Sequence, residues 1–298
     1  MNGNMWLKRL AIPVGVGLIF FFLGRNIYCN WDEVKGYQWH FNYMALTISF
    51  ILLLAALTFM LLLWRRILAR TGFSIGFRKS WRIWFISNLG HYVPGKVWQI
   101  MGMVYLCQKE GVPRMATLAS VIMAQVWSIL SAFILLGIYA FLSDAPQLPS
   151  YAPWLVFFVP LGLIMTYPPV MEKLANGVLK WLRREPIHLR IDFRQSLLFL
   201  GRYLLSWFLY GAAFFVFLLS LQAMPWRYFP AITSVFATSY TLGFLCLVVP
   251  GGLGVREGLL TALLSLYMPL PMATVVSLLS RLWFTAGELV CLGLALKA

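Results

Sequence analysis

Four charged residues stand in otherwise apolar sequence near the C-terminal end of the chain. Arg256 and Glu257 are adjacent, and Arg281 and Glu288 follow in a later apolar run. A guanidinium can bind a phosphate through two parallel hydrogen bonds, whereas a carboxylate can hold a guanidinium in place or receive a cation. Charged side chains within apolar segments are costly and usually face a cavity or each other. These residue types predict a binding site for a charged head group.

The stretch Pro250-Gly251-Gly252-Leu253-Gly254 precedes Arg256 and interrupts the apolar sequence. Proline and clustered glycines cannot continue a helix, so the backbone here leaves N–H groups without helical partners. An apolar helix follows, and the positive end of its dipole would face an occupant of the break, which suits a phosphate or a carboxylate. Pro94-Gly95-Lys96 predicts the same geometry earlier in the chain, with the Lys96 ammonium adding a charge. The alternative for both breaks is a kink between close-packed helices.

The first half of the chain adds polar candidates within apolar sequence, which are Asn88, His91, Gln99 and Gln125. Arg281 and Glu288 are seven residues apart, so they share one helix face about two turns apart. We interpret both as lining the same site as Arg256. The alternative is a structural pair, in which Arg281 contacts Glu288 or Glu257 and fixes the helix register.

The chain lacks the patterns of an enzyme or a metal centre. It contains nine acidic residues, most of them in loops, and no acid/base pair is evident. The four cysteines have no CxxC spacing and the three histidines are isolated, so we expect no metal and no cofactor. We also expect no catalysis. An intramembrane transferase, which can work with few charges, is the alternative.

The overall composition predicts an integral membrane protein. Of the 298 residues, 61% are hydrophobic and 11% are charged, and the mean hydropathy is +0.80. Soluble domains are about half apolar and about a quarter charged. The net charge of +15 lies mainly in short loops, where it indicates orientation and contact with anionic lipid. No soluble region is large enough for a nucleic-acid module, so we expect no nucleic-acid partner.

Apolar runs of roughly 17–25 residues predict an all-α polytopic fold in one membrane domain, residues 1–298. We predict about six full spans, at about 8–27, 43–64, 115–142, 153–170, 197–222 and 272–296. Two further apolar stretches, 81–108 and 229–268, are cut by the glycine breaks and predict broken, re-entrant hairpins. The basic stretch 171–196 is predicted to be a cytoplasmic loop, with an amphipathic helix on the membrane surface.

The distribution of basic residues favours one orientation. Of the 24 Lys and Arg residues, this topology leaves three outside and three at membrane depth and puts the remaining 18 on the cytoplasmic side. The positive-inside rule demands this asymmetry of short loops. We therefore predict a multi-pass protein of the inner membrane with both termini cytoplasmic. We expect the first helix to be retained, because its apolar run lacks a small-x-small cleavage site.

An internal repeat relates the two breaks. Gly102 follows Pro94 by eight residues, and Gly258 follows Pro250 at the same offset. The first unit begins by leaving the cytoplasm and the second by entering it, so the predicted halves are inverted. Inverted repeats whose broken helices meet near the midplane are common in transporters, because exchanging the two conformations gives alternating access. The predicted halves are residues 1–142 and 153–298.

The stretch Val249-Pro250-Gly251-Gly252-Leu253-Gly254-Val255-Arg256-Glu257-Gly258, with Asn88 and Pro94-Gly95-Lys96 upstream, resembles the transmembrane domain of lysylphosphatidylglycerol synthetase/flippase proteins. The resemblance covers nearly the whole chain. It implies that in two-domain relatives this part moves an aminoacylated phospholipid to the outer leaflet, while a separate soluble domain makes that lipid. The chain stops at Ala298, so we expect neither a synthetase domain nor lysyl transfer. Relatives linked to glycosylation imply a polyprenyl phosphate carrier, which leaves the head group open.

We therefore predict a flippase-like transporter that moves or binds a phospholipid or polyprenyl-phosphate head group. Lys96, Arg256 and Arg281 would hold the phosphate. Glu257 and Glu288 would balance the arginines or contact a cationic head group. The expected partners are anionic or zwitterionic membrane lipids, and a second copy of the chain or a lipid- or glycan-biosynthetic enzyme stays open. The alternative function is a non-transporting membrane partner of a glycosyltransferase or lipid synthetase.

Overall fold

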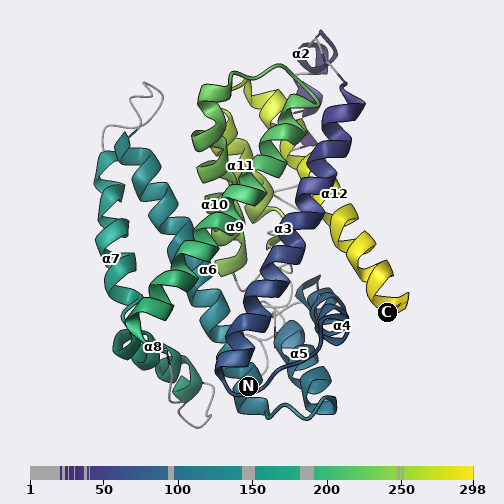
Figure 1. Ribbon diagram of the computed structural model, residues 1–298. Coiled ribbons are helices and arrows are strands. Elements are labelled where there is room, and N and C mark those ends of the chain that lie inside the picture. The colour runs from purple at the N-terminus through teal and green to yellow at the C-terminus, as the bar shows by residue number, and fades with distance from the viewer. Residues whose placement is uncertain are drawn as a thin grey trace, which may run out of the picture.

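The computed structural model describes residues 21, 24–25, 27–29, 31–36, 39, 41–92, 97–142, 152–181, 191–246, 249 and 252–297. These residues form helices and turns without a strand, which confirms the predicted all-α class (Figure 1). The predicted first span, 8–27, lies almost wholly outside the described residues. The short helix α2 (Trp31–Gly36), which is described, follows it. Some predicted site residues also lie outside them, namely Pro94, Gly95, Lys96, Pro250 and Gly251.

Within the described ranges, four helices are long and apolar enough to cross a membrane. At a rise of about 1.5 Å per residue each measures about 40 Å, which exceeds the roughly 30 Å of bilayer hydrocarbon. They coincide with the spans predicted at 43–64, 115–142, 197–222 and 272–296. The helices are α3 (Tyr43–Arg70), α6 (Arg114–Leu142), α9 (Phe193–Leu219) and α12 (Leu270–Lys297).

Helices α3 and α9 pack against each other and run antiparallel through the middle of the molecule. The Asn42 N–H before α3 donates to the Ser220 carbonyl after α9 at 2.9 Å, so the start of one helix meets the end of the other. Each start is capped: the Asn42 side chain accepts from the Ala45 N–H, and the Asp192 carboxylate accepts from the Gln195 N–H. Such caps satisfy amides that have no intrahelical partner and contribute about 1 kcal/mol each.

The span predicted at 153–170 is shorter in the structure. The chain forms a 3₁₀ turn, η2 (Ala152–Phe157), and the eight-residue helix α7 (Phe158–Met165), and then begins α8 (Pro168–Trp181). Two prolines open α8, because a proline lacks the N–H needed inside a helix and suits a first turn. The apolar helical segment Trp154–Met165 falls below the length of a span, so the count of six full spans is not confirmed.

Helix α8 occupies the beginning of the predicted basic loop 171–196. Met171 is buried, whereas Lys173 and Lys180 are exposed, so the helix has one apolar and one basic side. In Figure 1, α7 and α8 lie to the left of the long helices, with α8 at the lower end of the molecule. This position suits the predicted amphipathic surface helix.

The first hairpin is built from two short helices that pack side by side. They are α4 (Phe77–Asn88), which continues into η1 (Leu89–Tyr92), and α5 (Val97–Lys109). With 12 and 13 residues, each arm measures about 18–20 Å and is too short to span the hydrocarbon. An ion pair between Lys79 and Glu110, at 2.6 Å, joins the two arms at their base. The base lies at the lower end of the molecule in Figure 1.

The second hairpin consists of α10 (Phe229–Leu245), preceded by the turn η3 (Trp226–Tyr228), and α11 (Val255–Leu264). Its base lies at the opposite end from that of the first hairpin (Figure 1). There the Tyr267 hydroxyl lies 2.7 Å from that of Tyr139, at the end of α6, and its ring packs edge-on against Tyr228. The two hairpins therefore extend into the molecule from opposite ends.

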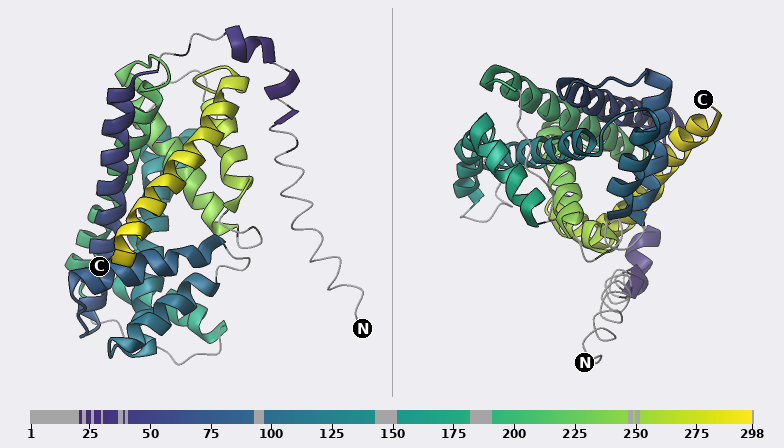
Figure 2. Two further views of the ribbon diagram at one scale, coloured as in Figure 1. Left: turned by 90° about the vertical axis from the view of Figure 1, so that its right-hand side faces the viewer. Right: turned by 90° about the horizontal axis from the view of Figure 1, so that it is seen from below.

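Each long helix that follows a hairpin packs against the other hairpin. Helix α6, which follows α5, contacts α10, and α12, which follows α11, contacts α4. In the left view of Figure 2, α12 crosses obliquely above α4 and α5 and beside the second hairpin. Two units of opposite sense would make these crossed contacts. The division into halves at 1–142 and 153–298 stays a prediction.

Candidate functional site

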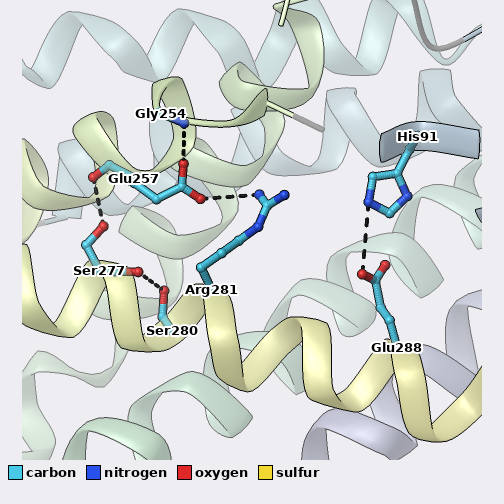
Figure 3. Close-up of polar contacts among 7 residues, drawn as sticks. All are labelled: His91, Gly254, Glu257, Ser277, Ser280, Arg281 and Glu288. Atoms are coloured by element: carbon cyan, nitrogen blue, oxygen red, sulfur yellow. Dashed lines mark hydrogen bonds and ion pairs between the residues drawn. The ribbon is translucent and has the colours of Figure 1, made fainter. Parts of the chain in front are cut away.

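Helix α12 carries charged residues that meet the inner end of each hairpin (Figure 3). Arg281 Nη1 lies 3.2 Å from Glu257 Oε1, at the start of α11. About two turns further along α12, Glu288 Oε2 lies 3.9 Å from His91 Nε2, in η1 after α4. Seven residues of helix correspond to about 10 Å. The inner ends of two hairpins from opposite ends of the molecule are thus held about 10 Å apart along one helix.

Glycines shape the start of α11. Gly252 and Gly254 have φ values of +66° and +80°, a region that side chains with a Cβ rarely adopt. The Gly254 N–H donates to Glu257 Oε2 at 2.6 Å, which satisfies one of the free amides at the helix start. The Ser277 hydroxyl donates to the Glu257 carbonyl at 2.8 Å and ties this turn to α12. The described part of the predicted break, residues 252–254, is therefore a turn that leads into α11.

We expect Gly252→Ala to destabilise the protein by about 1–3 kcal/mol, because alanine is strained at positive φ and its Cβ would meet a carbonyl. That Cβ would lie 2.6 Å from the Gly243 carbonyl oxygen on α10. Gly201→Ala is the matched control, since Gly201 is helical and its Cβ would meet open space. There alanine is neutral or stabilises by up to about 1 kcal/mol. Thermal unfolding in detergent measures both, and equal midpoints for the two variants would contradict the strained turn.

Glu257 serves the arginine and the backbone around it. Its side chain is 2% exposed, and its two oxygens are 2.6 Å from the Gly254 nitrogen and 3.2 Å from Arg281 Nη1. The structural Arg281–Glu257 pair considered from the sequence is therefore present. Glu257 does not contribute to the cavity wall described below. We assign it the role of holding Arg281 and the α11 turn in position.

Arg256 is buried among aromatic rings, with an exposed fraction of 5%. Its guanidinium carbon lies 4.8 Å from the centroid of Phe284, 5.0 Å from Tyr240 and 5.3 Å from Phe236. Ring faces attract a cation, and this contributes about 2 kcal/mol when the pair is desolvated. Among the described residues, Arg256 Nη2 is buried without a hydrogen-bond partner. A guanidinium donor held in this way is poised for an acceptor from outside the chain.

Arg256 and Arg281 open onto a cavity of about 120 Å³ between the two hairpins. A water molecule takes about 30 Å³ in the liquid, so the cavity has room for a small polar group. Its lining residues come from α3, α4, η1, α5 and α6 in the first half of the sequence and from α9, α10, α11 and α12 in the second. The lining residues of the polar part are Asn88, His91, Gln99, Gln125, Ser128, Arg256, Arg281 and Glu288.

The predicted polar residues from the two halves of the chain meet in this cavity. Asn88, Gln99, Arg256, Arg281 and Glu288 all line it. Asn88 Oδ1 accepts a hydrogen bond from Gln99 Nε2 at 2.7 Å, which joins the two arms of the first hairpin near its inner end. Gly252 and Gly254 lie behind Arg256 and shape its turn. Nothing in the sequence required these residues to share one cavity, because they are separated by up to 200 positions.

Aromatic residues complete the cavity, and sequence reasoning missed them. Phe236 and Tyr240 are four residues apart on α10, so they share the helix face that receives Arg256. Phe284 follows Arg281 by three residues on α12. Such spacing beside a buried arginine is the signal that could have found them. Of these three, Tyr240 and Phe284 line the cavity, and the remaining aromatic lining residues are Trp84, Trp207, Tyr210 and Phe244.

The charges at the cavity define what it can bind. Arg256 and Arg281 supply two cations, and Glu288 supplies one carboxylate at the other end of the same wall. In the described part of the cavity wall, Arg281 contacts Glu257, whereas Arg256 Nη2 has no hydrogen-bond partner and can receive an anion. Across the described part of the chain, no group of His, Cys, Asp and Glu side chains could hold a metal ion. The cavity can therefore bind an anionic group, with the Glu288 carboxylate on the same wall.

Comparison with known proteins supplies a family for this arrangement. No match was found among curated proteins or among solved structures. The family model described as the lysylphosphatidylglycerol synthase TM region matches residues 8–286, which is nearly the whole chain. The match includes both hairpins, α12 as far as residue 286, and every residue that lines the cavity except Glu288. Together with the helices long enough to cross a membrane, it indicates a multi-pass membrane protein with a lipid-related role. The chain belongs to the family of the lysylphosphatidylglycerol synthase TM region.

Proposed function

We propose that the protein is a flippase-like lipid transporter that binds the phosphate of a phospholipid or a polyprenyl phosphate in the cavity between its two hairpins. The observation that carries this proposal is Arg256, a buried guanidinium with an unpaired donor on the cavity wall. Burying such a charge is costly unless it is paired and hydrogen-bonded. A phosphate would supply both the counter-charge and the acceptor.

A lipid phosphate suits the depth of this site better than a soluble anion. Arg256 and Arg281 lie on helices flanked by apolar residues, well away from the chain's basic segments. A phosphate attached to acyl chains can reach that depth from the surrounding hydrocarbon. Family membership supports a lipid-related role independently. Glu288, on the same wall, would balance the arginines or contact a cationic part of the head group.

Transport is proposed because the hairpins enter from opposite ends. A head group at the cavity lies at the inner end of both hairpins, so a small movement of either one would connect it to a different side of the membrane. The crossed packing of α6 on α10 and of α12 on α4 would couple such movements. We place the basic ends of α3, α8 and α12 on the cytoplasmic side of the inner membrane, in accordance with the positive-inside rule.

The test is leaflet exchange in proteoliposomes. The purified protein is reconstituted with acyl-labelled lipids from a panel of anionic phospholipids, zwitterionic phospholipids and polyprenyl phosphates, and the label in the outer leaflet is quenched chemically. We expect exchange of at least one class well above that of protein-free liposomes. Unaltered exchange across the whole panel would contradict the proposal.

Two other functions predict different results from the same preparation. A non-transporting partner of a glycosyltransferase or lipid synthetase would show no intrinsic exchange and would co-purify with that enzyme at fixed stoichiometry. An intramembrane transferase would change the chemical identity of a lipid, which mass spectrometry of the extracted lipids would detect. The proposal includes no covalent step, so the lipid recovered after exchange should be unaltered.

A further inference from the structure

A second, narrower hollow lies between the first hairpin and α12. Its volume is about 20 Å³, and it is lined from α4 and η1 by Phe85, Asn88, Leu89 and His91 and from α12 by Glu288, Leu289 and Leu292. Helices α4 and α12 are in direct contact here. Trp81, nearer the base of the hairpin, donates a hydrogen bond to the Cys291 carbonyl at 3.0 Å and fixes the two helices together on one side of the hollow.

The hollow adjoins the head-group cavity. Asn88, His91 and Glu288 line both spaces. Their side chains therefore form a shared wall, with the arginines on one side of it and the α4–α12 interface on the other. The contact between His91 Nε2 and Glu288 Oε2, at 3.9 Å, crosses from the first hairpin to α12 at this wall. This contact marks the boundary between the two spaces.

The outer rim of the hollow is apolar and exposed. Leu89 is 44% exposed and Leu289 is 56% exposed, from η1 and α12 respectively. With Lys297 at the membrane surface, where the positive-inside rule puts it, Glu288 would lie nine residues or about 14 Å deeper, within the bilayer hydrocarbon. Leucine side chains offer a small anion from water neither a hydrogen bond nor a counter-charge. The polar wall inside and the leucines outside match a molecule with a polar head and apolar chains.

We propose that this hollow is the lateral entrance through which a lipid reaches the cavity, with its head group passing between His91 and Glu288 and its acyl chains remaining between Leu89 and Leu289 in the bilayer. The inference rests on the proposed function, and it adds the route that the lipid takes and the residues that line it. The hollow is too narrow for a head group as it stands. The His91–Glu288 contact keeps it closed, and α4 and α12 separate at this point to admit the lipid.

The first experiment maps the acyl chains directly and does not depend on transport. The purified protein is incubated in detergent with a phospholipid that carries a photoactivatable diazirine on its acyl chain, and the adducts are located by mass spectrometry. We expect adducts at residues 85–92 and 288–292 that fall at least fivefold in Arg256→Met, because the head group no longer anchors the lipid. Adducts at Leu282, which is exposed on α12 but lines neither space, should not change.

The second experiment narrows the entrance. Leu289→Trp places a bulky ring at the rim, and Leu282→Trp is its matched control, because both leucines are more than half exposed on α12. We expect Leu289→Trp to slow lipid exchange about tenfold and Leu282→Trp to leave it unchanged. Binding of inorganic phosphate in detergent should be the same in both variants, since phosphate does not need the lateral route.

The outcomes separate the route from the function. Adducts at 85–92 and 288–292 that persist in Arg256→Met would be ordinary surrounding lipid and would overturn the entrance. Arg256-dependent exchange that Leu289→Trp does not slow would also overturn it, while the transport proposal stands. Arg256-dependent adducts without any exchange would support the entrance and refute transport.

Discussion

Arg256→Met is expected to abolish lipid exchange while leaving the protein folded. The methionine keeps an unbranched side chain among the three rings but removes the guanidinium, whose Nη2 lacks a partner among the described residues. Loss of charge-assisted hydrogen bonds to a phosphate costs about 2–4 kcal/mol, which corresponds to a reduction in exchange of about 30- to 1,000-fold. The proteoliposome assay measures this directly.

The stability of the same variant distinguishes a binding arginine from a structural one. Removing a buried, incompletely paired charge is often neutral or stabilising, whereas losing the cation–π contacts costs about 2 kcal/mol. We therefore expect the free energy of unfolding to change by less than about 2 kcal/mol. A large fall in the thermal midpoint in detergent would indicate that Arg256 holds the fold instead.

Arg227→Met is the matched control, because Arg227 is exposed and its guanidinium lies 5.0 Å from the Tyr228 ring. It removes the same functional group from a cation–π contact outside the cavity, and we expect no change in exchange. Arg256→Lys separates charge from geometry, since lysine keeps the charge but loses the planar fork that binds two phosphate oxygens. Exchange by Arg256→Lys should fall between wild type and Arg256→Met. Lipid exchange by Arg256→Met at the wild-type rate would contradict the proposal that Arg256 binds the lipid phosphate.

Glu257→Gln is expected to be the most destabilising of the charge-removing substitutions. The Glu257 side chain is 2% exposed, and its carboxylate contacts both Arg281 and the Gly254 N–H. Breaking a buried ion pair from one side costs about 3 kcal/mol or more, because the remaining charge loses its compensation. Weakening the contact to the free amide at the helix start adds up to about 1 kcal/mol. The thermal midpoint in detergent should fall by roughly 6–12 °C.

Two comparisons isolate the ion pair. In Glu257→Gln/Arg281→Met both charges are gone, so at least half of the lost midpoint should return. Glu110→Gln removes the carboxylate of the Lys79 pair, whose side chains are 65% and 28% exposed, and exposed pairs contribute at most about 1 kcal/mol. A midpoint for Glu257→Gln as high as that of Glu110→Gln would mean that Glu257 does not hold the α11 turn.

Composition and glycine breaks were sufficient to predict much of the fold. The long apolar runs at 43–64, 115–142, 197–222 and 272–296 appear as α3, α6, α9 and α12, because helices are the structures that satisfy their own backbone in lipid. The break near 90–96 separates α4 from α5. The full span predicted at 153–170 is not confirmed. Hydropathy averages over the whole segment, whereas Pro168 and Pro169 decide locally where one helix ends and another begins.

The charged residues of the site could be predicted from the high cost of burying them, whereas their neighbours depend on how the helices pack. Arg256, Arg281 and Glu288 could be found because a charge in an apolar run needs a physical reason. The separate role of each residue could not be predicted, because it depends on which carboxylate contacts which guanidinium. In the structure Glu257 contacts Arg281 and does not line the cavity. The aromatic wall of Tyr240 and Phe284 was missed because aromatic residues are frequent in apolar helices and carry no signal until the arginine is placed beside them.

The shortness of the hairpin arms has an energetic consequence for a charge that crosses the protein. Helix α11 has ten residues and measures about 15 Å, which is half of the roughly 30 Å of hydrocarbon. The electrostatic self-energy of an ion in oil is of the order of 20 kcal/mol without compensation. In the proposed transport, polar groups at the inner ends of both arms would divide that single high barrier into two lower ones. The cavity would then be a resting place halfway along the path.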